Sequence, residues 1–179
     1  MKKFAFVIHG QPATKKNSAT MVRNRALLLP SKAYRKYESA CREALLSMKA
    51  QIGNLPHFTL PVRMTCLYYL KDSAHWPDLN GLLQATQDIL SDEYKTVNHK
   101  KSLSKEWLLS DDRIVSGYGQ SKIAGVDALD PRVEIEIAEL EVDLDTAYDP
   151  YIRKQLIEMQ KQGLFNNAEE PPITEVPYG

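Results

Sequence analysis

A near-continuous apolar run at residues 62–70 constrains the fold of this chain more than any other feature. Its sequence, VRMTCLYYL, contains only Arg63 and Thr65 as polar residues. Such continuous apolarity is typical of a central strand in a β-sheet. With 179 residues, the chain has the length to bury one core in a single domain. The sequence therefore predicts one domain built around this strand.

Alternation and capping residues predict the elements around this strand. Residues 133–140 alternate between apolar and mainly acidic side chains, which predicts a half-buried strand with an acidic outer face. Ser31 predicts the start of a helix that runs to about Ile52 and ends at Gly53. A second helix is predicted to start at Asp78, with a stripe of leucines facing inward. Further strands are predicted at residues 4–8, 26–29 and 114–118.

The order of these elements favours an α+β domain with a mixed β-sheet backed by helices. We expect this domain to span residues 1–142. Within it, residues 91–109 are polar and lack a clear period, so we expect an insertion or flexible loop there. Residues 143–179 are expected to form an acidic extension, with a peripheral helix at 147–163 and disorder from Asn166 onward.

The two ends of the chain carry opposite charge, although the formal net charge is zero. Residues 1–63 hold twelve Lys and Arg against two acids, whereas residues 127–179 hold thirteen acids against four Lys and Arg. This asymmetry indicates a basic face for a polyanion such as nucleic acid, together with an acidic tail. Alternatively, the charges intermix in three dimensions, in which case the asymmetry has no functional meaning.

Cysteine usage and hydropathy argue against several other classes of protein. Cys41 and Cys66 belong to no Cys/His cluster, so neither a zinc site nor a disulfide framework is indicated. The first residues lack the pattern of a signal peptide, and no apolar run approaches the length of a membrane span. We therefore expect a soluble, cytoplasmic protein without a membrane partner.

Acidic residues in and after the second predicted helix suggest a site for a hard cation. Asp78 is either the N-cap of that helix or a metal ligand. Asn80, Gln84 and Asp88 follow at four-residue spacing, as a polar stripe that is either functional or simply solvated. The tandem pair Asp111-Asp112 would be repelled by Asp78 unless a cation such as Mg²⁺ lay between them. A metal held there would activate a water and stabilise charge on a phosphoryl oxygen.

Basic residues gather ahead of the first predicted helix and in its first turns. Residues 14–18 are polar and loop-like, and seven basic residues fall between positions 15 and 36 without an acid among them. Such residues are candidates for phosphate contacts, which supply affinity rather than sequence readout. The candidate nucleic-acid-binding residues are Lys15, Lys16, Asn17, Arg23, Arg25 and Lys32.

Six short motifs follow one another along the chain. They lie at residues 10–18 (GQPATKKNS), 29–38 (LPSKAYRKYE), 77–83 (PDLNGLL), 87–90 (QDIL), 111–112 (DD) and 131–135 (PRVEI). Together they resemble the RusA family of Holliday junction resolvases, the phage-associated crossover junction endodeoxyribonucleases. The resemblance covers about residues 3–140 and leaves the acidic tail outside it. Each motif alone is weak, and the ordered set is what makes the resemblance specific.

The resemblance implies a homodimer that binds branched DNA and cuts paired strands of four-way junctions with Mg²⁺, or with Mn²⁺ as an alternative. By matched position, Asp78 and Asp112 would bind the metal, and Asn80 and Asp88 would complete or support the catalytic site. Asn80 stands where the family has a second acid, and Gln84 where it has a lysine. Because of these departures, an alternative is a protein of the same fold that binds branched DNA without cutting it. A third alternative is an oligomerising protein without a nucleic-acid role.

Overall fold

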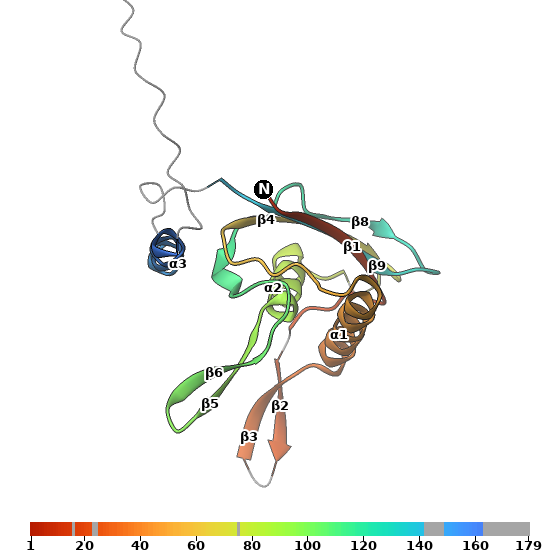
Figure 1. Ribbon diagram of the computed structural model, residues 1–179. Coiled ribbons are helices and arrows are strands. Elements are labelled where there is room, and N and C mark those ends of the chain that lie inside the picture. Colours follow the sequence, from red (N-terminus) through yellow and green to blue (C-terminus); the bar gives the residue numbers. More distant parts are fainter. Residues whose placement is uncertain (16, 23–24, 75, 142–148, 163–179) are drawn as a thin grey trace, which may run out of the picture. The chain divides into compact units, whose positions relative to one another are not determined.

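The computed structural model describes residues 1–15, 17–22, 25–74, 76–141 and 149–162 (Figure 1). The chain divides into two compact units, Met1–Glu141 and Val142–Gly179. The described part of the second unit contains helix α3 (Pro150–Lys161), which begins after the N-cap Asp149. This helix lies within the segment where the sequence predicts one, whereas the disorder predicted from Asn166 onward lies outside the described residues.

The first unit is an α+β domain with a mixed five-stranded sheet, as the sequence predicts. The order along the sheet is β1-β9-β4-β7, and β8 also pairs with β4. β9 runs antiparallel to both β1 and β4, whereas β7 and β8 run parallel to β4. β4 is therefore the central strand. The five strands are β1 (Lys3–His9), β4 (Val62–Leu70), β7 (Val115–Gly117), β8 (Lys122–Val126) and β9 (Arg132–Glu139).

One face of the central strand forms much of the core. Along β4, fully buried residues alternate with half-buried or exposed ones, and Met64, Cys66 and Tyr68 all point into the core. Helices α1 (Lys32–Ile52) and α2 (Leu79–Leu90) lie on the same side of the sheet (Figure 1). β9 shows the predicted alternation, because its valine and isoleucines are buried and its glutamates are half-buried.

Both helices of the first unit begin and end close to where capping residues predict. Ser31 Oγ accepts a hydrogen bond from the backbone N–H of Tyr34 at 3.1 Å, which caps the start of α1. α1 ends at Gly53, whose φ of 85° is a conformation that favours glycine. Asp78 caps α2 and Ser91 follows its last residue.

Three buried hydroxyls join the two helices to the sheet. The Oγ1 atom of Thr86 on α2 lies 3.0 Å from the hydroxyl of Tyr37 on α1 and 2.9 Å from the hydroxyl of Tyr68 on β4. All three side chains are at most 2 % exposed. Burial raises the pKa of both tyrosines well above the usual value, so the three groups form a neutral, mutually satisfied set.

Two hairpins complete the first unit: β2 (Asn17–Val22) pairs with β3 (Arg25–Pro30), and β5 (Glu93–Val97) pairs with β6 (Lys100–Lys105). The strand predicted at residues 26–29 corresponds to β3. The loop predicted at residues 14–18 is wrong at Asn17 and Ser18, which belong to β2.

The flexible loop expected at residues 91–109 is also a wrong prediction, whereas the alternative of an insertion stays a prediction. The segment forms the hairpin β5–β6, with Asn98 and His99 in its turn at φ of 50° and 61°. Sequence patterns miss this hairpin because nearly all of its residues are exposed, so its strands lack the alternation of a half-buried strand. The chain then returns to the core through the buried residues Trp107, Leu108 and Leu109.

The remaining differences from prediction are small. The strand predicted at residues 114–118 is shorter in the structure, since a 3₁₀ turn (Asp112–Ile114) precedes β7, and β8 is not predicted at all. The two cysteines are free and buried. Among the described helices, none combines the length and the apolar character needed to cross a membrane.

Candidate acidic site at the end of helix α2

Three carboxyl groups influence one another electrostatically near the C-terminal end of α2. Asp88 lies in the last turns of the helix, and Asp111 and Asp112 lie at the start of the 3₁₀ turn. Partial burial raises the pKa of Asp112, and the neighbouring Asp111 and Asp88 raise it further. Burial alone would also raise the pKa of Asp111, but hydrogen bonds from Arg113 and Asp112 lower it. Opposite shifts in adjacent carboxyls are typical of a pair that shares a site of high negative potential.

The predicted basic loop reaches this cluster through one residue. Lys15 Nζ lies 2.7 Å from Asp88 Oδ2, and it also lies 5.9 Å from the centre of the Tyr34 ring on α1. Lys15 is a predicted phosphate contact and Asp88 a predicted catalytic carboxylate. The structure places them side by side, although they are far apart in the sequence. The ion pair is partly exposed, so its net contribution to stability is small.

Two residues that the sequence analysis does not single out hold the Asp111-Asp112 turn against α2. The side-chain amide of Gln87 donates a hydrogen bond to the backbone carbonyl of Asp112. The Tyr118 hydroxyl donates in turn to Gln87 Oε1. Burial raises the pKa of Tyr118, with Cys66 and then Asp112 and Asp88 adding to the shift. No sequence pattern links Gln87 and Tyr118 to the acidic pair, because the contacts depend on the return of the chain after β6.

Replacing Gln87 by Leu is expected to loosen the Asp111-Asp112 turn. The change removes both hydrogen bonds of the Gln87 side chain, and we expect a loss of about 1–2 kcal/mol in the free energy of unfolding. Amide hydrogen exchange should accelerate at Arg113 and Ile114. Gln84→Leu, one turn earlier at an exposed position, is the matched control. Equal exchange at these amides in the wild type and the Gln87 variant would contradict the assigned contact.

The other predicted ligands lie at the opposite end of α2. Asp78 Oδ1 accepts a hydrogen bond from the backbone N–H of Gly81 at 2.6 Å, so Asp78 serves as the N-cap. Asn80 is exposed in the first turn of the helix. Ten residues at a rise of about 1.5 Å each separate Asp78 from Asp88 by roughly 15 Å along the helix. Asp88 thus acts electrostatically on Asp112, whereas Asp78 and Asn80 lie at the other end of the helix.

Gly81 marks a close approach of the loop before β2 to the start of α2. A Cβ atom at this position would lie 2.9 Å from Asp78 Oδ1 and 3.0 Å from Cγ2 of Thr14. A larger residue would therefore displace the loop that carries Lys15. This approach explains how a loop near the start of the chain runs along α2 and delivers Lys15 to Asp88.

The end of α2 presents carboxylate oxygens, which are the donor type that hard cations prefer. Within the described ranges, no three or more His, Cys, Asp or Glu side chains form a group that could hold a metal ion. Mg²⁺ is commonly held by only one or two carboxylates, with waters and substrate phosphates completing its shell. Asp88 and Asp112 supply two carboxylates whose mutual repulsion a cation would relieve. That Asp78 and Asn80 act as metal ligands stays a prediction.

The predicted nucleic-acid-binding residues are only partly described. Lys16 and Arg23 lie outside the described residues. Asn17 lies at the start of β2, opposite Pro30, and Arg25 is the first residue of β3. Lys32 is exposed at the first position of α1, and Lys15 pairs with Asp88 as described above.

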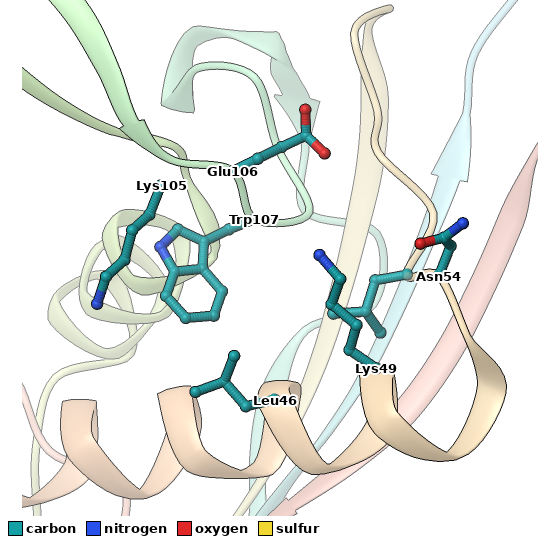
Figure 2. A pocket seen from close by; sticks show the side chains of 7 residues that line it. Leu46, Lys49, Asn54, Lys105, Glu106 and Trp107 are labelled. Carbon is teal, nitrogen blue, oxygen red and sulfur yellow. The ribbon is translucent and has the colours of Figure 1, made fainter.

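A separate hollow of about 630 Å³ lies between the end of α1 and the segment that follows β6 (Figure 2). Trp107 stands over α1 in this view, with the Leu46 side chain beneath it. None of the predicted site residues lines this hollow, so the acidic site lies elsewhere on the first unit. The lining residues are Leu46, Lys49, Asn54, Leu55, Lys105, Glu106 and Trp107.

No protein-family model matches the chain, and no curated protein matches it. The resemblance to the RusA family therefore stays a prediction that rests on the six motifs. The geometry adds an observation that the motifs alone do not contain: Lys15 from the basic loop pairs with Asp88 near the end of α2.

Proposed function

We propose that this protein is a Mg²⁺-dependent, structure-selective endonuclease that cuts four-way DNA junctions. One observation carries the proposal: Lys15 pairs with Asp88, and Asp88 in turn acts electrostatically on Asp112. A phosphodiester substrate needs cationic groups that hold its phosphates and acidic oxygens that hold a metal. Both kinds of group occur here within one short stretch of surface.

Each residue of the acidic site has a role in this proposal. Asp88 and Asp112 would hold the cation, and Arg113 keeps Asp111 ionised beside them. Lys15 would hold a backbone phosphate once DNA competes with Asp88 for its ammonium group. When bound, Mg²⁺ supplies an activated water and stabilises negative charge on the phosphoryl oxygens. Asp78 caps the start of α2, roughly 15 Å along the helix from Asp88. We therefore place the cation at the C-terminal end of α2.

A homodimer belongs to the same proposal. Paired cuts in opposed strands of a junction require two active sites related by a two-fold axis. The proposed cation site takes both of its carboxylates, Asp88 and Asp112, from one copy of the chain. Two copies of the chain would therefore supply the second site.

The test is cleavage of a synthetic four-way junction with and without Mg²⁺, beside a linear duplex of the same sequence. We expect symmetric nicks on the junction, only with the metal, and no product from the duplex. Binding is followed in parallel by gel shift. Cutting of both substrates alike would contradict structure selectivity, and cutting without any divalent cation would contradict the metal site.

A second candidate is a branched-DNA-binding protein that does not cut. It is favoured by the neutral side chains of Asn80 and Gln84 at the start and middle of α2, and by the Lys15 ammonium already paired with Asp88. This candidate predicts tight, salt-sensitive junction binding with no metal-dependent product. The cleavage experiment separates the two, because the gel shift reports binding whether or not the DNA is cut.

A further inference from the structure

The β5–β6 hairpin is a basic, solvent-exposed arm. Residues 94–105 contain four lysines and one histidine but no Asp or Glu. Every residue in this stretch is exposed except Ser104, which is half-buried. None of the four lysines forms an ion pair with a carboxylate of the described part of the chain. The lysines are Lys95, Lys100, Lys101 and Lys105.

The pairing register distributes the lysines over both faces of the hairpin. Lys101 pairs with Thr96, and it shares a face with Tyr94, whose ring centre lies 4.1 Å from its Nζ atom. Lys95 and Lys100 lie on the other face, because residues directly opposite each other share a face and successive residues alternate. The Tyr94 hydroxyl donates to the backbone carbonyl of Ser110, and both faces of the arm present cations to solvent.

Exposed apolar side chains lie among the lysines. Tyr94, Val97 and Leu103 are 40 %, 62 % and 50 % exposed. Tyr94 and Leu103 are directly opposite each other, and Val97 is opposite Lys100. A hairpin that is merely solvated needs no such side chains, whereas a nucleic-acid contact uses cations for phosphates and apolar or aromatic groups for bases.

An ion pair and a cation–π contact anchor the base of the arm to α1. Arg42 on α1 pairs with Glu93 Oε1 at 3.2 Å, and its guanidinium carbon lies 4.2 Å from the centre of the Trp107 ring. Trp107 Nε1 donates to the same Glu93 oxygen at 3.2 Å, and the Trp107 backbone N–H donates to Asp92 Oδ1 at 2.7 Å. Figure 2 shows Trp107 above the helix, with Lys105 beside it. The arm therefore leaves the domain from a fixed point.

We propose that the β5–β6 hairpin inserts into the major groove of duplex DNA and holds one arm of the branched substrate. A two-stranded ribbon fits a major groove about 12 Å wide, and five paired residues at about 3.3 Å each exceed its depth of about 8.5 Å. Lysines on both faces then meet the phosphates on both walls of the groove. This inference rests on the proposed function, since it names how that substrate is bound.

The test compares two double variants that lose the same charge. Lys100→Gln with Lys101→Gln removes two cations from the arm, and Lys154→Gln with Lys161→Gln removes two from exposed positions on α3. Binding to a fluorescent duplex and to a four-way junction is measured by anisotropy over a range of salt, without a divalent cation. We expect the arm variant to bind about tenfold or more weakly, with the slope of log K against log salt smaller by about two. The α3 variant should match the wild type.

The outcomes separate this inference from the proposed function. If the wild type binds DNA and the arm variant binds with the same affinity and salt slope, the proposed DNA contact of the arm is contradicted. The endonuclease proposal then still stands. If the wild type binds no DNA even at low salt, both are overturned. A loss seen with single-stranded DNA but not with duplex would overturn insertion into a groove. Lys100→Arg with Lys101→Arg keeps both charges and should keep binding.

Discussion

Replacing Asp112 by Asn is expected to lower junction cleavage by about 100-fold or more while junction binding stays within about twofold. Partial burial raises the pKa of Asp112, and the neighbouring Asp111 and Asp88 raise it further. An amide of the same shape removes the charge that would hold a cation. The backbone carbonyl that accepts from Gln87 is unchanged, so the turn should keep its place. Single-turnover cleavage at saturating protein, with a gel shift beside it, measures both effects.

Two further variants make this result specific. Asp130→Asn removes a carboxylate from the turn before β9, where it pairs with His9, and should leave cleavage unchanged. Asp78→Asn should also leave the fold intact, because Asn caps a helix about as well as Asp. A large loss of cleavage in the Asp78 variant together with normal cleavage in the Asp112 variant would place the cation at the start of α2. It would contradict the site assigned at the end of that helix.

Replacing Thr86 by Val is expected to cost about 2–4 kcal/mol of unfolding free energy. Val has nearly the same shape but leaves the buried hydroxyls of Tyr37 and Tyr68 without their shared partner. Each tyrosine keeps only a thiol neighbour, Cys41 for Tyr37 and Cys66 for Tyr68, and a thiol is a weak hydrogen-bond partner. A poorly satisfied buried hydroxyl costs about 1–3 kcal/mol, and two are affected at once. Urea denaturation followed by tryptophan fluorescence measures the loss.

A triple variant tests the cause of that loss. Tyr37→Phe and Tyr68→Phe added to Thr86→Val remove all three hydroxyls, so no buried polar group is left without a partner. We expect most of the stability to return, to within about 1 kcal/mol of the wild type. If the single variant matches the wild type, or the triple variant is as unstable as the single one, the hydroxyl set does not tie the helices to the sheet.

The helices and the central strand are predictable because their signals are local. Ser31 and Gly53 bound α1 through capping geometry, and the apolarity of residues 62–70 identifies β4. The hairpin β5–β6 is not predictable in this way, because neither of its faces is buried. Thr86 shows the same limit in the core. It fits the apolar stripe of α2, yet its hydroxyl bonds reach a different helix and a strand.

The sequence predicts which residue types the acidic site contains, but it does not predict which of them lie close together. Asp88, Asp111, Asp112 and Lys15 all stand out in the sequence by charge and spacing. The length of α2, however, decides which carboxylates can meet, and it carries Asp78 away from the others. The Lys15–Asp88 ion pair depends on how the loop before β2 crosses α2, which no local pattern encodes.

The pairing of β1 with β9 has a consequence for how the domain is made. Lys3 lies opposite Ala138, so the first strand of the unit cannot pair until its last strand has been made. Loop closure over such a distance is costly and contributes to slow folding. Until β9 emerges, β1 and β4 lack their shared neighbour, and their unpaired edges are open to other chains. We therefore expect the nascent first half to associate with other chains more readily than a domain built from local hairpins would.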